Sequence, residues 1–522
     1  MLTSRRAPRL PTLLVGLLTM TLALPTFALA TSAGAQSPQP GVAGIPKAKG
    51  AAEATLLRYA RDTWASFVAM TDPVSGLPAD SLSSDGTTSV QTSVTNIGAY
   101  MWSTLVADGL GIIGHEEAVQ RLRQTLGSLE TMERHEPSGQ YYNWYDHRTG
   151  AKLTLWPPTG EPIGPHGPIL SSVDNGWLAA ALHMVATSVP EVAARAGALY
   201  DSMDFGFYYR ADVNRIAFHY APDDGFSPCC YDTIVSESRI ASYIGIAKGE
   251  IPAREYFGSW RTFPDTCDWG WPETKPVGVT RTYLGVSVFE GAYQYDGMRI
   301  VPGWGGSMFE ALMPALFVPE EKWGPDSWAL NHPLTIAAQI HHGLVDAEYG
   351  YWGFSPANIP EGGYATYGVD AIGMDPGGYA SNEDNTLVDH GFGTCPGREA
   401  KPDPLPSAYT NGVVTPHAAF LALRWAPDAT LANLAGLEQD FPDMYGAWGF
   451  RDSVNVGTGT VSDAYLSLDQ GIVMAAIGNA LGHDMLRRAF STAEVKAALQ
   501  PVISIEQFGA GPRVRAVHVD DR

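Results

Sequence analysis

The chain has 522 residues, 45% hydrophobic and 17% charged, and this composition excludes a disordered or fibrous protein. Its formal net charge of −22 argues against nucleic acid and polyanionic glycans as partners, because an acidic surface repels both. Aromatic residues make up 11% of the chain, which fits either an aromatic core or surfaces that stack on sugars.

Residues 1–35 have the three parts of an export signal. Arg5 and Arg6 precede an apolar run over residues 13–29, and small residues follow it, with Ala28-Leu29-Ala30 as one candidate cleavage site. A membrane anchor is the alternative, but Pro25 interrupts the run. We expect a secreted protein that has no stable membrane insertion after the signal is removed.

Apolar residues recur at helical spacing along most of the remaining chain, and strand signals are few. Residues 36–52 are rich in Pro, Gly, Ser and Ala and are expected to form a flexible linker, followed by one catalytic domain over residues 53–500 and a C-terminal tail over 501–522. Helices are expected after residue 51, around 97–105, from 115, and near 175–188, 190–202, 236–248, 307–318, 332–346, 415–425, 430–440, 467–481 and 483–500.

The segments between these helices are long and rich in Gly, Pro, Trp and Tyr, notably 136–172, 203–232, 262–304 and 350–412. Loops of this length usually carry function or small strands. The pattern predicts an all-α fold, a toroid of helical hairpins with decorated loops at one end. An α-solenoid is the alternative, but the sequence has no fixed repeat of 34–45 residues.

The four cysteines, Cys229, Cys230, Cys267 and Cys395, allow two disulfides in an exported protein, and the spacing leaves their connectivity open. No C-x-x-C or H-x-x-H spacing occurs, so neither a metal ion nor another cofactor is expected.

Polar and aromatic residues gather beside expected helix ends, in segments 141–146, 171–176, 231–239, 304–310, 352–358 and 465–471. Hydrolysis of a glycosidic bond needs two carboxyl groups, and aromatic rings stack on sugar faces. These segments supply both kinds of residue. Asp174 and Glu237 also have a structural explanation, because a carboxylate in a first helical turn is stabilised by the helix dipole. No nucleophile elbow or phosphate-binding loop is present.

Several of these segments resemble a known family in sequence order. Residues 91–98, QTSVTNIG, resemble "TSPTNIG"; residues 142–150, YNWYDHRTG, resemble "FNWYDTRT"; and residues 304–314, WGGSMFEALMP, resemble "WSGSMFEYLMP". With residues 231–239 and 468–471, they identify the chain as similar to the glucoamylase-like family of bacterial glycoside hydrolases. That family includes endo-β-1,2-glucanases and the transglycosylase domain of cyclic β-1,2-glucan synthases, and the resemblance covers about residues 55–490.

The resemblance implies an (α/α)6 barrel with Glu237 as the general acid. The second carboxylate is left open among Glu361, Asp370, Asp174 and Asp146, since Pro356 stands where the synthases have their nucleophile. We expect the loops around Trp144, Trp304 and Trp352 to line one cleft. The expected substrate-binding residues are Trp144, Tyr145, Asp146, Trp304, Glu310 and Trp352.

The expected function is a secreted glycoside hydrolase or transglycosylase acting on a neutral glucan-like poly- or oligosaccharide, with a β-1,2 linkage as one option. A catalytically inactive carbohydrate-binding protein on the same fold is the alternative, motivated by Pro356, whereas the intact Glu237 favours an enzyme. A polysaccharide lyase is disfavoured because it needs cations to neutralise a uronate. The sequence leaves the oligomeric state open.

The export signal is directly testable. N-terminal sequencing of the exported protein is expected to begin near residue 36, because the charged, apolar and small-residue parts form a cleavable signal. An exported protein that begins at Met1 would contradict the prediction.

Overall fold

The computed structural model describes residues 50–157, 159–264, 266–267, 274–374, 391–398 and 405–512. The chain divides into two units, Met1–Val42 and Ala43–Arg522, and every described residue belongs to the second. The predicted signal and the linker up to residue 49 lie outside these residues. Within the described part of the chain, no helix is long and apolar enough to cross a bilayer.

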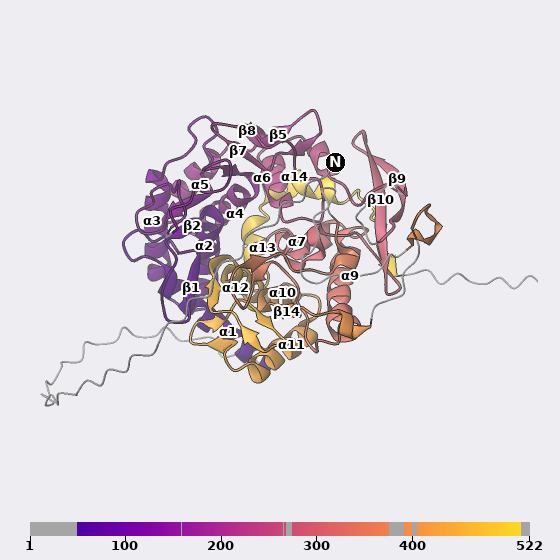
Figure 1. Ribbon diagram of the computed structural model, residues 1–522. Helices are drawn as coiled ribbons and strands as arrows, with labels where there is room; N and C mark the ends of the chain where they lie inside the picture. Colours follow the sequence, from indigo (N-terminus) through magenta and orange to yellow (C-terminus); the bar gives the residue numbers. More distant parts are fainter. Residues whose placement is uncertain are drawn as a thin grey trace, which may run out of the picture. The chain divides into compact units, whose positions relative to one another are not determined.

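Six helices are buried over most of their surface, because apolar and small residues occupy nearly all their sides. They are α2 (Val94–Gly109), α4 (Ser172–Ser188), α6 (Arg239–Ala247), α7 (Met308–Leu312), α10 (Pro416–Leu421) and α12 (Ser467–Leu481). α2 packs against α4 and α12, α4 packs against α6, and α10 packs against α7 and α12 (Figure 1). Arg239 joins α6 to α7 by donating hydrogen bonds to the backbone carbonyls of Glu310 and Ala311.

A second set of helices packs one apolar face against the buried six and exposes the other face. In α3, for example, Leu122, Leu126 and Leu129 are buried on one side, while Glu116 and Glu117 are exposed on the other. This set is α1 (Ala51–Met70) on α2 and α12, α3 (His115–Thr131) on α2, α5 (Ala193–Asp201) on α4, α9 (Trp328–His341) on α7, α11 (Pro427–Asp440) on α10 and α14 (Ala493–Ile503) on α6. The short helices α8 (Glu320–Trp323) and α13 (Met485–Phe490) complete the α-helices of the described residues. The fold is predominantly helical, as the periodicity predicts.

Short strands lead directly into four of the buried helices. β2 (Gln91–Ser93) precedes α2, β4 (Leu170–Ser171) precedes α4, β14 (Val413–Val414) leads to α10, and β19 (Ala464–Leu466) precedes α12. Each pairs antiparallel with a strand from another loop: β3 (Trp144–Asp146), β7 (His219–Ala221), β17 (Val454–Asn455) and β1 (Ser81–Ser83), respectively. These pairings fix the loops that begin the helices, and the serines Ser93, Ser171 and Ser307 cap α2, α4 and α7 through their side chains.

The expectation of an all-α fold is wrong in the segment 262–304. β9 (Val277–Tyr283) and β10 (Val286–Tyr295) form a long antiparallel hairpin that continues into β11 (Met298–Ile300) and β20 (Gly511–Pro512). Val and Thr residues dominate β9, which favours extended backbone. The two-residue turn needs positive φ at both positions, and Leu284 and Gly285 have φ of 48° and 82°.

Five further pairs of short antiparallel strands lie in the loops of the described residues. They are β5 (Tyr209–Arg210) with β6 (Arg215–Ile216), β8 (Gly225–Phe226) with β7, β12 (Ala357–Asn358) with β13 (Tyr364–Ala365), β15 (Tyr445–Gly446) with β16 (Gly449–Phe450), and β18 (Thr460–Val461) with β17. The long loops therefore carry small strands, as their length predicts.

Residues 501–512, expected as part of a tail, pack with the rest of the unit. Phe508 and Ala510 belong to the hydrophobic core, and the buried Glu506 pairs with Arg261 and accepts a hydrogen bond from Tyr256. One disulfide joins Cys267 to Cys395, while Cys229 and Cys230 are free, so one of the two expected disulfides is absent from the described residues.

The packing of α12 on α2 depends on a glycine. A Cβ built at Gly471 would lie 2.6 Å from the Cβ of Ala99, so we expect Gly471→Ala to lower the free energy of unfolding by about 1–3 kcal/mol. The matched control is Gly197→Ala in α5, where the nearest atom lies 4.0 Å away and the better helix propensity of alanine is expected to stabilise slightly. Equal stability of the two variants in urea unfolding would contradict close helix packing.

Candidate active site

Six carboxyl groups interact in series beside the N-terminal ends of the buried helices. We call Glu310, Glu237, Asp174, Asp80, Asp469 and Asp452 the carboxylate row. Neighbours in that order interact: Glu310 and Asp174 raise the pKa of Glu237, Asp174 raises that of Asp80, and Asp80 and Asp452 raise that of Asp469. Helix N-termini favour negative charge, which helps to explain how so many acids gather at one place.

Glu237 and Glu310 form one end of the row. Glu237 lies just before α6, and its backbone N–H donates to Oε2 of Glu310 at 2.8 Å. Nε1 of Trp177 donates to Oε2 of Glu237 at 2.5 Å. Loss of surrounding water and the charge of Glu310 raise the pKa of Glu237 well above its usual value, and loss of water raises the pKa of Glu310 to about 7. The pair can therefore retain a proton near neutral pH.

Asp174 lies in the first turn of α4 and is held at both oxygens. Thr95 donates to Oδ1 at 2.5 Å, and the Asn143 amide, oriented so that both its groups are bonded, donates to Oδ2 at 2.8 Å. The Asn143 oxygen accepts from Nε1 of Trp144 at 3.1 Å. Burial raises the pKa of Asp174 while the hydrogen bonds from Ser171 and Thr95 oppose the rise. The carboxyl is therefore fixed in orientation next to Glu237.

The other end of the row is held by residues far apart in the sequence. Asp80 accepts from Nδ2 of Asn96 at 2.8 Å, and the backbone N–H of Ser467 donates to the Asp80 carbonyl, which ties this loop to the start of α12. Asp452 and Asp469 are buried, and burial together with their mutual interaction raises the pKa of Asp469 well above its usual value.

The imidazole of His417, in α10, lies beside these two acids. Burial lowers the pKa of His417 to about 3, so the ring is neutral. One ligand atom each from His417, Asp452 and Asp469 lie within 4.8 Å of one another, and this cluster is therefore the part of the described site that is able to hold a metal ion.

A buried ion pair supports the Glu237 end. Arg239 and Glu320 are bonded at 2.6 Å, and Glu320 also binds Tyr243 and His332. Arg239 donates to the backbone carbonyls of Ser236 and Glu310 as well, at 2.8 Å each. It therefore clamps the turn that carries Glu237 against the helix that carries Glu310.

Aromatic rings lie near the row, among them those of Trp304 and Trp144. Trp304 stacks with Phe218 and packs edge-on against Tyr231, whose pKa is raised by loss of water and by the charge of Glu237. Trp144 is half-buried and packs edge-on against Trp156. The rings of Trp304 and Trp144 are therefore close to the acids of the carboxylate row.

Tyr364, which the sequence analysis did not single out, is 58% exposed. Loss of water around its hydroxyl and the charges of Asp469, Asp452 and Glu237 raise its pKa. The hydroxyl is therefore near both ends of the row while much of the side chain remains open to solvent.

Several expected site residues lie elsewhere. Trp352 is 2% exposed, and its backbone is bonded to Asn433 of α11; Tyr145 is also buried, and its hydroxyl donates to the Glu133 carbonyl. Neither ring offers a face to a sugar, so the expectation that the loops of Trp144, Trp304 and Trp352 line one surface does not hold for Trp352.

Three of the proposed second carboxylates also differ from Asp174 in their surroundings. Partial burial opposes ionisation of Asp146, but its bonds to Arg148 lower its pKa. Glu361 is exposed in a turn, and Asp370 is buried. No interaction that the structure gives for the described residues places Asp146 or Glu361 in the carboxylate row.

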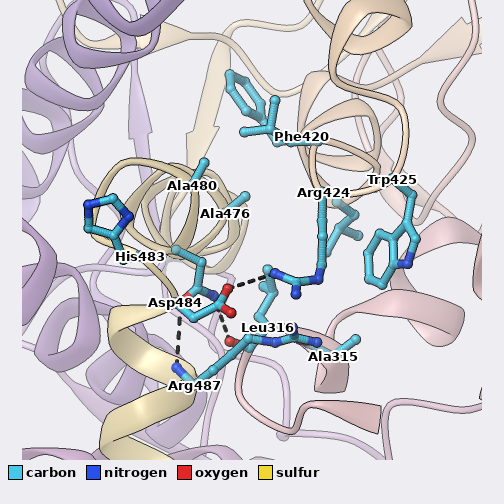
Figure 2. A pocket seen from close by; sticks show the side chains of 13 residues that line it. Ala315, Leu316, Phe420, Arg424, Trp425, Ala476, Ala480, His483, Asp484 and Arg487 are labelled. Carbon is cyan, nitrogen blue, oxygen red and sulfur yellow. Dashed lines mark hydrogen bonds and ion pairs between the residues drawn. The ribbon is translucent and has the colours of Figure 1, made fainter. Parts of the chain in front are cut away.

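A cavity of about 470 Å³ lies at the other ends of α10 and α12 and contains no member of the carboxylate row. Figure 2 shows Arg424 directed at Asp484 in this cavity, and the two are bonded at 2.6 Å. Arg487 is bonded to Glu321. Because these cations are already paired with carboxylates, the cavity lacks the free acids that glycoside hydrolysis needs.

Two family models match the chain. Residues 279–494 match a family described as "Putative glucoamylase", and residues 58–208 match one described as "Protein of unknown function (DUF3131)". The chain is 25% identical over 304 residues to the cyclic β-(1,2)-glucan synthase NdvB of Rhizobium meliloti, an alignment that covers 55% of this chain and 8% of the synthase. It is 21% identical over 408 residues to an exo β-1,2-glucooligosaccharide sophorohydrolase (non-reducing end) of Parabacteroides distasonis, covering 76% of this chain and 51% of that protein. The chain thus spans about half, or less, of these two relatives.

Solved structures share the fold. The endo-β-1,2-glucanase from Chitinophaga pinensis, in complex with sophorotriose and glucose, superposes with a TM-score of 0.62 at 18% identity, covering 87% of this chain and 98% of that one. A β-1,2-glucanase from Parabacteroides distasonis superposes with a TM-score of 0.63 at 16% identity, covering 87% and 60%. The resemblance to the glucoamylase-like family that the motifs predict is confirmed by the match over residues 279–494 and by these relatives.

Proposed function

We propose that the protein is a glycoside hydrolase that cleaves a neutral β-1,2-linked glucan, with Glu237 as the general acid. The observation that carries this proposal is the Glu237–Glu310 pair, in which the Glu237 backbone N–H holds the Glu310 carboxyl, and burial and the charge of Glu310 raise the pKa of Glu237. A leaving alkoxide needs that proton in the transition state. The similar solved structures support the linkage, since they include an endo-β-1,2-glucanase and a β-1,2-glucanase.

We propose Asp174 as the second carboxylate. It neighbours Glu237 in the row, and Thr95 and Asn143 fix both its oxygens, so it is oriented to activate water or to stabilise positive charge on the sugar. Pro356 has no nucleophilic side chain, so the chemistry is proposed to run through acid–base action rather than a covalent intermediate at that position.

The proposal extends to the architecture and the location. Contacts run in the order α6, α4, α2, α12, α10 and α7, and Arg239 joins α6 to α7. An outer helix packs on each of the six, and this arrangement supports an (α/α)6 barrel. The acidic row favours a neutral substrate because it repels uronates and phosphates. Export from the cell is proposed from the N-terminal signal alone.

The role of Glu237 is tested by Glu237→Gln, which keeps the shape of the side chain and removes its proton. We expect turnover of linear β-1,2-glucan to fall by about 10²–10⁴-fold, with the thermal unfolding midpoint nearly unchanged. The control is Glu361→Gln, an exposed acid outside the row, which is expected to keep full turnover. Reducing-sugar release on β-1,2-, β-1,3- and β-1,4-glucans reads out both activity and linkage.

Two results would count against this assignment. Near-normal turnover by Glu237→Gln would make Glu237 a structural residue. Binding of β-1,2-glucan by the wild-type protein without any cleavage would identify a carbohydrate-binding protein instead.

The coupling of Glu237 to Glu310 predicts a shift in the pH profile. The general acid acts only when protonated, so activity falls as pH rises through the pKa of Glu237. Glu310→Gln removes a neighbouring negative charge but keeps an oxygen to accept the Glu237 N–H, so it is expected to lower that pKa and move the alkaline limb of kcat/KM to lower pH. An alkaline limb that stays in place, or moves to higher pH, would show that Glu310 does not set the proton affinity of the acid.

A further inference from the structure

A buried cluster at the far end of the carboxylate row has polar atoms that the protein leaves without partners. His417, Asp452 and Asp469 are 2%, 2% and 6% exposed. Nε2 of His417 accepts no hydrogen bond from any described residue, and Oδ1 of Asp452 and Oδ2 of Asp469 have no hydrogen-bond partner outside the cluster. Buried polar atoms in folded proteins nearly always have a partner, so an unpartnered imidazole nitrogen beside two adjacent acids is suited to a ligand that is positively charged or donates hydrogen bonds.

The hydrogen bonds around the imidazole determine which nitrogen is available. Thr415 Oγ1 donates its hydrogen to the Asp452 carbonyl at 2.6 Å. The same oxygen lies 2.7 Å from Nδ1 of His417, so it must accept there, and Nδ1 carries the ring hydrogen. Nε2 therefore presents a lone pair. An imidazole whose tautomer is fixed by an outer hydrogen bond is the usual form of a metal-binding histidine.

The two carboxylates are also held from outside the cluster. The backbone N–H of Asn358 donates to Oδ2 of Asp452 at 2.6 Å, which leaves Oδ1 free to face another group. Asp469 lies in the first turn of α12, and its Oδ2 lies 3.4 Å from Nδ1 of His417. Asp80 adds further negative charge beside Asp469. One imidazole and two carboxyl groups, with one ligand atom from each within 4.8 Å of one another, form a ligand set of mixed nitrogen and oxygen.

We propose that His417, Asp452 and Asp469 bind one divalent cation of the kind that accepts both imidazole and carboxylate ligands, such as Zn²⁺ or Mn²⁺. The ion would join α10, α12 and the loop before β17, which come from separate parts of the chain. It would also neutralise two adjacent acids at one end of the row. This inference does not depend on the substrate or on the role of Glu237.

The test uses the full chain and Zn²⁺ as the probe. Protein treated with a chelator and dialysed is titrated with Zn²⁺ by calorimetry, and bound metal is counted by mass spectrometry. We expect one ion per chain in the wild type, and an affinity at least about 10-fold weaker in His417→Gln and Asp469→Asn. His135→Gln is the matched control, because His135 is partly exposed, bonded to Ser138 and outside the cluster, and it is expected to bind as the wild type does.

A second measurement decides the matter if the variants fail to fold. X-ray absorption at the zinc edge of the wild-type protein is expected to show one imidazole with oxygen ligands. A site with several imidazoles would place the ion elsewhere and overturn the proposal. Absence of binding in the chelator-treated wild type would overturn it as well, and would indicate that Asp452 and Asp469 share a proton instead.

Discussion

The arrangement of the candidate active site depends on the buried ion pair between Arg239 and Glu320. Arg239 follows Glu237 by two residues and reaches the carbonyls of Ser236, Glu310 and Ala311, so one side chain sets the distance between α6 and α7. Glu320 is shared with Tyr243 and His332, which leaves both of its oxygens bonded. Removing one partner of a buried pair typically costs about 3–5 kcal/mol, since the other charge is left uncompensated. Several buried hydrogen bonds of Arg239 and Glu320 therefore fix the position of Glu237.

The carboxylate row is a consequence of placing helix N-termini together. Each helix start accommodates an acid easily, but several acids at one place repel one another and lose water. Burial and the neighbouring charges raise the pKa of Glu237 well above its usual value, so the protein meets part of this cost by protonation. Such perturbed groups are typical of catalytic sites. The same environment that destabilises the charged forms thus supplies the protonated acid that glycoside cleavage needs.

Part of this site is predictable from sequence because its residues lie in local patterns. Glu237, Asp174 and Glu310 each stand at the start of a helix in a recognisable segment, and the structure brings all three together. Asp80 and Asp452 lie in loops with no such pattern, and only the pairing of β1 with β19 and the contact with Asn358 bring them to the row. Trp352 and Tyr145 show the converse, since an aromatic residue in a polar loop segment looks the same in sequence whether its ring faces solvent or core. Apolar periodicity does not predict the β9–β10 hairpin, because the strand signal of this segment is its β-branched composition.

The central claim is that a sugar chain binds with its scissile bond between Glu237 and Asp174. The most direct measurement is a crystal structure of the Glu237→Gln protein with a β-1,2-glucooligosaccharide. The account predicts that the glycosidic oxygen lies within hydrogen-bonding distance of the residue 237 side chain, and that Trp304 and Tyr364 contact the neighbouring sugar rings. An oligosaccharide bound away from the carboxylate row, for example in the cavity lined by Arg424 and Asp484, would contradict it.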